Sequence, residues 1–313
     1  MKTNIKTDKN GKKVLLIGAN GFLGSYILKL NNSKKFLDQN LWLFAADLEN
    51  TRIMNHVPFY YLDITDLAKV SKTVMKISPD VIILTAALTH VDQCEIDKSL
   101  ATKINVEGTK NIIKISKKIN SKLVFMSTDF IFDGTKESGL CYSESDDPNP
   151  LNHYAKTKLE AEQSIIYAEI DYLICRTSVL YGWNKDKLNF ITWMLKNFEQ
   201  NNKISIVRDQ INSPTFIRNL AEIILKLIEK GAQGIYHTAG DSVLSRYEMA
   251  IQSAEIFGYR RDLVVGIDNL TQKAVRPKNV GLNINKLKNL IGDELAVYSF
   301  EKGLLHMKDH KFI

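Results

Sequence analysis

Short apolar runs alternate with longer amphipathic stretches between residues 13 and 182. The runs KVLLIGA (13–19), DVIILTAAL (80–88) and KLVFMST (122–128) are almost continuously apolar and rich in β-branched side chains. Such runs are typical of strands buried on both faces, and strands that are joined through helices pair in parallel. The expected fold class is therefore α/β, with a doubly wound parallel sheet of Rossmann type covered by helices on both faces. Further strands are expected at 41–47, 58–63, 171–182 and 234–240.

The regular alternation ends near Gly182, which predicts a second and smaller unit. After it come a long helix candidate, less regular segments, and one more apolar run, GIYHTAG, that returns to the main sheet. The first residues are polar and predict a flexible leader. The expected division is a leader at 1–12, a dinucleotide-binding domain at 13–182 and 216–240, and a smaller α/β substrate-binding lobe at 183–215 and 241–313.

The amino-acid composition limits which binding partners and which cellular compartment we expect for the protein. The net charge of +7 comes mostly from lysines scattered along all 313 residues, without the clustered basic residues and stacking aromatics that nucleic acid binding needs. No apolar run approaches the roughly 20 residues that span a membrane, and the leader lacks the apolar segment of a secretory signal. Three cysteines without a CxxC pair argue against a disulfide framework and against a metal site. We therefore expect a soluble cytoplasmic protein without nucleic acid or membrane partners, whose sequence shows no cluster of metal ligands and leaves the use of a metal open.

Three glycines follow the first apolar run, where a helix is expected to start: Gly18, Gly21 and Gly24, in the order GANGFLG. Glycines here allow a tight turn and the close approach of a pyrophosphate to the helix N-terminus, where unpaired N–H groups bind anions. Asp47, at the end of the next run, can accept hydrogen bonds from ribose hydroxyls. The pattern predicts a bound dinucleotide, and a glycine-rich turn without a ligand is the alternative.

Three charged side chains could influence how the adenine is bound and whether NADH or NADPH is preferred. Asp63, at the end of the third run, could border the adenine or cap the helix expected from Leu67. The carboxylate of Asp47 would repel a 2′-phosphate, whereas Arg52 could pair with that phosphate. We therefore expect NADH or NADPH as the cofactor, with Asp47 favouring NADH.

The segment HYAKTK places Tyr154 and Lys158 four positions apart, which is one helical turn. A phenol beside an ammonium could be a proton donor held ready, or it could be an ordinary surface pair. The same spacing recurs at Tyr181 and at Tyr298, each with a lysine four residues further on. Spacing alone therefore does not single out the first pair.

The glycine spacing, GxxGxxG, resembles that of the extended short-chain dehydrogenase/reductase superfamily, whose YxxxK motif lies on the helix after a strand that carries Ser or Thr. Thr128 ends such a run ahead of Tyr154, whereas Tyr181 falls in a loop and Tyr298 has no such strand before it. The resemblance narrows to the dTDP-4-dehydrorhamnose reductase family, whose motifs occur here in the same order. They are AALTHVDQCE (86–95), STDFIFDG (127–134), NHYAKTKLEAE (152–162), RTSVLYG (176–182), DQINSPT (209–215), GIYHTAG (234–240) and RPKNVGLNINKL (276–287).

This resemblance implies a chemistry for three side chains. Tyr154 would donate a proton to the developing alkoxide of a ketone, and Lys158 would favour the phenolate by its charge and bond the nicotinamide ribose. Thr128 would hold the substrate oxygen next to Tyr154. The resemblance also implies cofactor contacts at Gly18, Asn20, Gly21, Phe22, Leu23, Gly24, Asp47, Asp63, Ile64, Ala86, Ala87 and Lys158, and substrate contacts at Asp129, Phe130, Asn189, Asp209, Gln210 and Arg276.

Alternatives remain open for the substrate residues. Arg276 could pair with a diphosphate, since its fork suits phosphate oxygens, or be a surface arginine before a turn proline. DQINSPT, which contains Asp209 and Gln210, could face the sugar or be a polar loop that enters the helix near Ile217. Val179 stands where rhamnose-forming members usually have Trp, so the exact sugar stays open.

The reaction class follows from an absence. Related dehydratases carry an acidic residue after the TD pair, whereas Asp129 here is followed by Phe130. We therefore predict NAD(P)H-dependent reduction of a 4-keto sugar nucleotide, most simply dTDP-4-dehydrorhamnose to dTDP-L-rhamnose, in a protein that is a homodimer, as is usual in this superfamily. One alternative is a cofactor-binding regulatory subunit that resembles the beta subunit of methionine adenosyltransferase. Another is a nucleotide-sugar epimerase that keeps its NAD through turnover.

Overall fold

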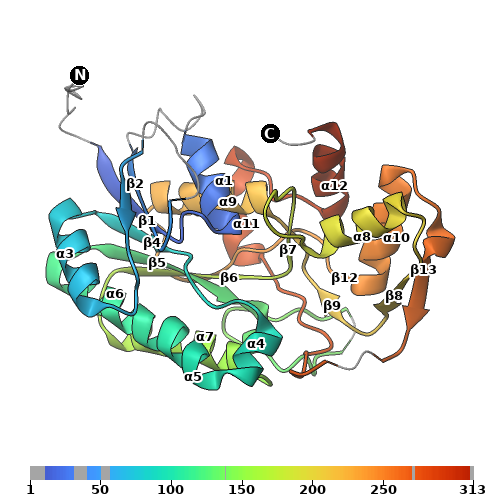
Figure 1. The fold of residues 1–313 in the computed structure, drawn as a ribbon, viewed down its shortest axis with the longest axis horizontal. Coiled ribbons are helices and arrows are strands. Elements are labelled where there is room, and N and C mark those ends of the chain that lie inside the picture. The colour runs from blue at the N-terminus through green and yellow to red at the C-terminus, as the bar shows by residue number, and fades with distance from the viewer. Residues whose placement is uncertain (1–10, 32–40, 51–56, 138, 270–271, 311–313) are drawn as a thin grey trace.

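Seven strands form one parallel sheet in the order β11-β6-β5-β4-β1-β2-β3, within the residues that the computed structural model describes (Figure 1). Those residues are 11–31, 41–50, 57–137, 139–269 and 272–310. The strand order reverses beside β1, so a ligand crevice is expected at the carboxyl ends of β1 and β4. The predicted doubly wound α/β fold is confirmed. The sheet strands are β1 (Lys12–Ile17), β2 (Leu41–Asp47), β3 (Phe59–Tyr61), β4 (Val81–Leu84), β5 (Lys122–Thr128), β6 (Tyr172–Thr177) and β11 (Gly234–His237).

The predicted boundaries differ from the structure at three places. β1 begins at Lys12, inside the expected leader. The run at 58–63 forms only the short strand β3. The run at 171–182 divides in two, because the chain leaves the sheet after β6, at Ser178, whose hydroxyl donates to Asp129. Its last residues form β7 (Leu180–Tyr181), which pairs in parallel with β10 (Thr215–Phe216) outside the main sheet.

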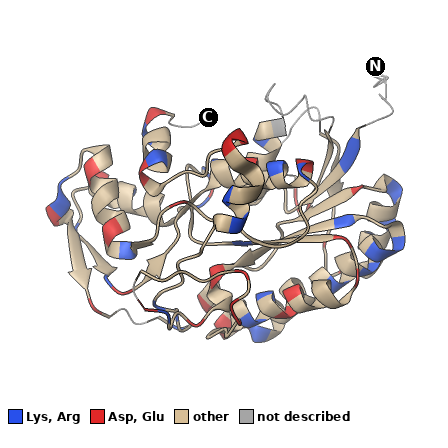
Figure 2. Ribbon diagram, turned by 180° about the vertical axis from the view of Figure 1, so that it is seen from behind, with Lys and Arg blue, Asp and Glu red and all other residues tan. Residues whose placement is uncertain are grey.

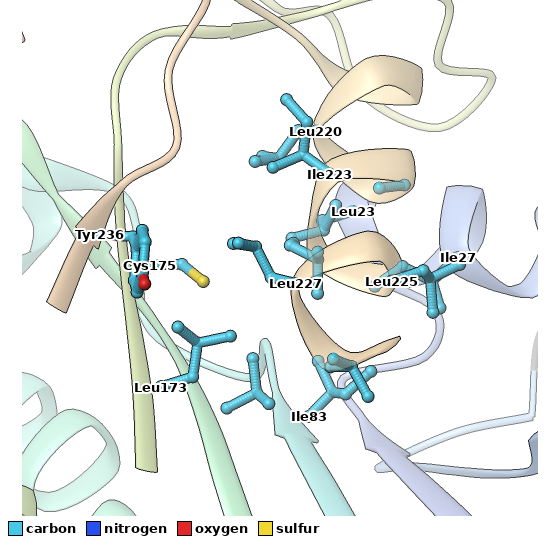
Figure 3. Packing of buried hydrophobic residues seen from close by; sticks show 14 of the residues in the cluster. Leu23, Ile27, Ile83, Leu173, Cys175, Leu220, Ile223, Leu225, Leu227 and Tyr236 are labelled. Atoms are coloured by element: carbon cyan, nitrogen blue, oxygen red, sulfur yellow. The ribbon is translucent and has the colours of Figure 1, made fainter. Parts of the chain in front are cut away.

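Different helices cover the two faces of the sheet, since successive strand residues point to opposite sides. Leu16 and Ile83 pack on one face with side chains of α1 and α9, and Figure 3 shows Leu23 and Leu227 of these helices pointing toward the strands. Leu15 belongs to the core of the other face. The helices are α1 (Phe22–Asn31), α9 (Ile217–Glu229) and α11 (Asn285–Ile291) on the first face, and α3 (Leu67–Ile77), α6 (Gly108–Ile119) and α7 (His153–Tyr167) on the second.

A third apolar cluster lies outside the sheet and forms the interior of the smaller lobe. Its fully buried members include Met194, Phe198, Met249 and Phe300. Helix α11, which was expected in this lobe, packs instead against the sheet core, so the two-domain division remains a proposal. The lobe elements are α8 (Phe190–Glu199), β8 (Ile204–Val207), α10 (Arg246–Phe257), β13 (Val264–Ile267) and α12 (Phe300–Asp309) (Figure 1).

Lysines gather on the outer side of α3 and α6, which pack against each other (Figure 2). Neither helix contains Asp or Glu, so this side of the molecule is more basic than the even scatter along the sequence predicts. Nearby carboxylates neutralise part of the charge, because Lys69 pairs with Asp66 and Lys110 pairs with Glu107. The absence of a nucleic acid partner stays a prediction. The lysines are Lys69, Lys72 and Lys76 on α3 and Lys110, Lys114, Lys117 and Lys118 on α6.

Candidate active site

Gly18 and Gly24 close the turn between β1 and α1 so tightly that neither position has room for a side chain. A Cβ on Gly18 would lie 2.5 Å from the amide nitrogen of Ala86 and 2.5 Å from Oγ1 of Thr85, and the φ of Gly18 is +90°. A Cβ on Gly24 would lie 2.2 Å from the carbonyl oxygen of Gly18. The turn therefore brings the N-terminus of α1 to the carboxyl edge of the sheet, which is the arrangement that a pyrophosphate needs.

Asp47 lies beside this turn, at the end of β2. Its Oδ2 accepts a hydrogen bond of 2.8 Å from the amide of Asn20, and its Oδ1 accepts one of 2.7 Å from the amide of Leu48. Asn20 donates through its side chain to the carbonyl oxygen of Glu49. The carboxylate is thus fixed next to the glycine turn, and each oxygen keeps a lone pair for a ribose hydroxyl. Arg52, which was expected to influence cofactor choice, lies outside the described residues.

Two of the expected cofactor residues point their side chains into the core. Leu23 is 6% exposed and packs between α1 and α9 (Figure 3). Ile64 is 5% exposed and faces Gly108, where a Cβ would come within 2.7 Å of it. These residues could contact a cofactor only through their backbone. Phe22, in contrast, is partly exposed and packs edge-on against Tyr26.

Asp63 does not cap the helix that follows it. Its Oδ1 accepts hydrogen bonds from the amide and the hydroxyl of Thr65, both at 2.8 Å. The cap of α3 is Asp66, whose Oδ1 accepts a hydrogen bond of 3.0 Å from the amide of Lys69. The capping alternative for Asp63 is therefore wrong, and its place beside an adenine stays a prediction.

Thr128, Tyr154 and Lys158 lie together at the carboxyl end of β5. Thr128 is the last residue of that strand, and the phenol of Tyr154 interacts with its side chain. Tyr154 lies in the first turn of α7, two residues after the N-cap residue Asn152. One turn further on, the ammonium of Lys158 lies 3.9 Å from the centre of the Phe125 ring, on β5. The helix therefore turns the predicted pair toward the strand end and not toward solvent.

Burial is the main influence on the titration of this pair. It raises the pKa of Tyr154 above its usual value, and the negative charge of Asp129 adds to the rise while Thr128 opposes it. Burial also lowers the pKa of Lys158, which is 3% exposed, to about 7. The carboxylate of Glu162 opposes that fall. At neutral pH the phenol thus carries its proton, while the amine titrates close to neutrality.

The other two tyrosine–lysine pairs have different surroundings. Tyr181 is 1% exposed and donates its hydroxyl hydrogen bond to the carbonyl oxygen of Phe300 at 3.2 Å. Lys185 is exposed in the loop that follows. The ammonium of Lys302 lies 4.1 Å from the ring centre of Tyr298, a contact between the two partners themselves. Packing in the smaller lobe accounts for both pairs, so the structure singles out the pair on α7.

Asp129 is a buried carboxylate next to Thr128. It is 2% exposed and accepts hydrogen bonds from Oγ1 of Thr128 at 3.0 Å, from Nδ2 of Asn212 at 3.3 Å and from the hydroxyl of Ser178. Burial raises the pKa of Asp129 to about 6, although these hydrogen bonds and the positive charge of Arg246 lower it. Asp129 therefore affects the site in two ways: it accepts the hydrogen bond of Thr128, and its charge raises the pKa of Tyr154. Its contact with a substrate stays a prediction.

The backbone amide of Phe130 donates to Oγ1 of Thr128 at 3.2 Å, and its ring is partly buried against the sheet core. Asn189 is the N-cap of α8. Its Oδ1 accepts a hydrogen bond of 3.2 Å from the amide of Thr192, and its Nδ2 donates one of 2.6 Å to the carbonyl oxygen of Gly182. Local structure thus accounts for the polar atoms of Asn189, and substrate contacts by Phe130 and Asn189 stay predictions.

Asp209 and Gln210 lie in the segment between β8 and β9 (Ile211–Asn212). Gln210 donates through Nε2 to Oε1 of Gln272 at 3.3 Å, and the carboxylate of Asp209 lies 3.4 Å from the ammonium of Lys278. Both partners come from the later segment of the chain. A role in substrate binding for Asp209 and Gln210 stays a prediction, and so does the alternative of a polar loop.

Arg276 joins the smaller lobe to the helix α4 (Val91–Ile96). Its Nη1 donates to Oδ1 of Asp92 at 2.8 Å and to the carbonyl oxygen of Ala274 at 2.7 Å, and its side chain is 13% exposed. The hydrogen bond from Arg276 holds the pKa of Asp92 below its usual value. The alternative of a surface arginine is therefore wrong, and the expected contact with a diphosphate stays a prediction.

Asn105 is a site residue that the sequence analysis missed. It is 1% exposed, in the π-helical turn Lys103–Glu107. Its Oδ1 accepts from the amide of Leu88 at 2.8 Å, and its Nδ2 donates to Leu88 at 3.1 Å and to Oγ1 of Thr157 at 3.0 Å. It thereby ties the loop with Ala86 and Ala87 to α7. The sequence feature that could have revealed Asn105 is its polar amide on a helix face that is otherwise apolar.

The RmlD substrate binding domain family matches residues 12–310. The chain belongs to this family. Among its relatives, the dTDP-4-dehydrorhamnose reductase of Aggregatibacter actinomycetemcomitans is 31% identical over 293 residues, which are 90% of this chain and 93% of that protein. The methionine adenosyltransferase 2 subunit beta of Xenopus tropicalis is 30% identical over 289 residues, which are 90% of this chain and 83% of that protein.

A solved structure shows the same fold at comparable identity. The crystal structure of dTDP-4-dehydrorhamnose reductase from Bacillus anthracis, in complex with NADP, is 31% identical and superposes with a TM-score of 0.84, covering 96% of this chain and 99% of that one. The predicted resemblance is therefore confirmed. The class of NAD(P)-dependent oxidoreductase and the nicotinamide cofactor are confirmed at the level of the RmlD family.

The described residues contain neither a membrane-spanning helix nor a cluster of metal ligands. No helix in the described part of the chain is both long and apolar enough to cross a bilayer. The same residues contain no group of three or more His, Cys, Asp and Glu side chains that could hold a metal ion. The homodimer stays a prediction.

Proposed function

We propose that this chain reduces the 4-keto group of a sugar nucleotide with NADH or NADPH, most simply dTDP-4-dehydrorhamnose to dTDP-L-rhamnose. The observation that carries the proposal is the grouping of Thr128, Tyr154 and Lys158 at the carboxyl end of β5. This is the same edge of the sheet to which the glycine turn brings the N-terminus of α1.

The residues at this edge fit a nicotinamide dinucleotide. Gly18 and Gly24 allow the tight turn that brings the N-terminus of α1 to this edge, and Asp47 is held beside that turn with acceptor atoms for ribose hydroxyls. A bound nicotinamide would supply the hydride that reduces the ketone carbon. The loop with Ala86 and Ala87, held in place by its hydrogen bonds to Asn105, would form the neighbouring wall.

The proton comes from the phenol of Tyr154. As the carbonyl oxygen gains negative charge, the O–H bond of Tyr154 breaks and the proton goes to that oxygen. The phenolate left behind is stabilised by the ammonium of Lys158, and the hydroxyl of Thr128 fixes the substrate oxygen beside the phenol. Positioned proton transfer of this kind contributes roughly 10²–10⁴-fold to the rate.

The surroundings of Asp129 support reduction over loss of water. Dehydration needs a second acid–base group beside the first, and Phe130 stands where the related dehydratases carry it. Asp129 itself already accepts hydrogen bonds from Ser178 and Asn212. Val179, a partly exposed apolar residue, replaces the usual Trp, so the proposal extends to 4-keto sugars other than the rhamnose precursor.

The test is a panel of 4-keto sugar nucleotides offered to the purified chain with NADH and with NADPH. We expect oxidation of the reduced cofactor by at least one member of the panel, and the 4-hydroxy sugar as product. Release of oxidised cofactor with each turnover separates this reductase from an epimerase, which would retain it. No turnover on the whole panel would contradict the proposal.

A regulatory role is a second candidate, because a methionine adenosyltransferase 2 subunit beta is 30% identical to this chain. Such a role requires no proton donor. Here Tyr154 interacts with Thr128, and Lys158 lies over the ring of Phe125 on the same strand, so all three residues of the proposed proton donor group are present. Stable co-purification with a methionine adenosyltransferase, together with no turnover of any keto sugar nucleotide, would reverse the choice.

A further inference from the structure

Arg246 reaches the active site because two short strands pair across the smaller lobe. It is the first residue of α10 and follows β12 (Leu244–Ser245), which runs antiparallel to β9. The amide of Arg246 donates to the carbonyl oxygen of Gln210 at 2.9 Å. Two residues beyond Gln210, Asn212 donates to Asp129. This pairing therefore places Arg246 beside the carboxyl end of β5, and its charge acts on Asp129.

The guanidinium of Arg246 is stacked but lacks an acceptor. Its carbon lies 4.7 Å from the ring centre of Phe190, and the side chain is partly buried. No oxygen among the described residues accepts a hydrogen bond from this guanidinium or forms an ion pair with it. Burial lowers the pKa of Arg246 to about 10, although the charge of Asp129 opposes this. A partly desolvated cation with free N–H donors is costly unless an anion binds there.

Other arginines of the described chain do not share this combination. Arg208 also stacks on an aromatic ring, that of Tyr247 at 4.4 Å, but it is exposed to water. Arg276, which the sequence picked for a diphosphate, differs in having a carboxylate partner, because its Nη1 donates to Asp92 and to the carbonyl oxygen of Ala274. Ion pairs with carboxylates are formed by Arg176, Arg218, Arg260, Arg261 and Arg276.

We propose that Arg246, stacked on Phe190, binds the diphosphate group of a nucleoside-diphosphate substrate. The proposal rests on the proposed function and adds the residue that holds the substrate's anion. A planar fork matches two phosphate oxygens at once, and stacking on Phe190 fixes its plane before the substrate arrives. The charge of Arg276, which acts on Arg246, makes the same region more attractive to an anion. The carboxylate of Asp129, which acts on Arg246, opposes an anion there.

The test is a calorimetric titration of the full-length, NADPH-loaded protein with dTDP. Arg246→Met keeps an unbranched apolar side chain beside Phe190 but removes the guanidinium, with its charge and its donors. We expect dTDP to bind this variant roughly 10- to 100-fold more weakly, the loss typical of hydrogen bonds to a charged group. Arg246→Lys, which keeps the charge without the fork, should recover part of the affinity. Arg208→Met, the matched variant of a stacked arginine outside the site, should bind dTDP like the wild type.

The affinity for NADPH, measured on the same samples, shows whether each variant is folded. If Arg246→Met fails to bind NADPH, Arg246→Gln provides the same comparison with the same expected loss. Unchanged dTDP affinity in a folded variant overturns the role of Arg246 and leaves the proposed function standing. An altered pH profile with unchanged dTDP affinity also overturns it, because Arg246 would then only balance Asp129. A wild-type chain that binds NADPH but no dTDP or UDP overturns the proposed function itself.

Discussion

Arg176 and Glu162 form a buried ion pair directly behind the active-site lysine. The Nη2 of Arg176 lies 2.8 Å from Oε2 of Glu162, and its Nε donates to both carboxylate oxygens at 3.1 and 3.3 Å. The two side chains are 4% and 1% exposed. Glu162 also lies one helical turn beyond Lys158 and raises its pKa. A single carboxylate thus acts on a structural cation, Arg176, and on the proposed catalytic lysine, Lys158.

Glu162→Gln should lower the free energy of unfolding and move the alkaline fall of activity to lower pH. It leaves the Arg176 guanidinium buried without its partner, at a cost of about 3–5 kcal/mol. It also removes the charge that raises the pKa of Lys158, so activity should fall at a lower pH than in the wild type. Chemical unfolding and a pH profile of kcat/KM measure the two effects. Arg176→Gln is the control, since it breaks the same ion pair but should not bring the alkaline fall to lower pH.

Tyr154→Phe should reduce kcat at least about 100-fold and leave NADPH binding nearly unchanged, because only the proton donor is removed. Steady-state kinetics on a turned-over substrate and a cofactor titration measure this. Tyr298→Phe is the control and should stay near full activity, as should Tyr181→Phe if losing its hydrogen bond to Phe300 does not unsettle the lobe. Retention of more than about a tenth of kcat by Tyr154→Phe would contradict its role as the acid.

Lys158→Met should make the cofactor-free protein more stable while abolishing its activity. The pKa of this lysine falls from 10.5 to about 7 on folding, so between these values the unfolded chain binds more protons and stability rises with pH. Removing the amine should therefore stabilise the fold by roughly 1–3 kcal/mol at pH 7 and below. The gain should shrink toward pH 10. Urea unfolding at several pH values measures it, and a less stable variant at pH 7 would show that the burial of the ammonium is not a cost.

Asp47 should favour NADH over NADPH, because its carboxylate beside the glycine turn would repel a 2′-phosphate. Asp47→Ala should lose that preference, while its kcat with saturating NADPH should change little. The measurement is kcat/KM with each cofactor. If the wild type prefers NADPH by more than about tenfold, selection by Asp47 is excluded.

The sheet was predictable because buried parallel strands leave a continuous apolar signature, and β4 and β5 carry it. The grouping of Thr128, Tyr154 and Lys158 was predictable because their motif lies on one helix and one strand end, whereas their chemical roles stay predictions. Side-chain direction was not: Leu23 lies in the right segment, yet its side chain faces the core. Ile64, which precedes α3, also faces the core, because periodicity gives the face of a regular helix but not that of the turn before it.

The sequence pattern could not predict the contacts that form across the smaller lobe. Arg246 is a single arginine at the start of a helix, and only the pairing of β9 with β12 brings it to Asp129. Asn189 is the converse case, because its side chain caps α8 and this local role does not follow from the motif, while its contact with a substrate stays a prediction. Long-range pairing between two-residue strands leaves too little sequence signal to be read in advance.

The interior of the smaller lobe is assembled from two stretches of chain that the sheet elements α9 and β11 separate. Met194 and Phe198 come from the first stretch, whereas Met249 and Phe300 come from the second. Neither stretch could be transplanted alone, since half of an apolar interior would then face water. Recombination at a single crossover therefore cannot exchange this lobe between relatives as a cassette. Divergence toward new substrates is then simpler by single substitutions, such as one at Arg246 inside this lobe or at Val179, which precedes it in the chain.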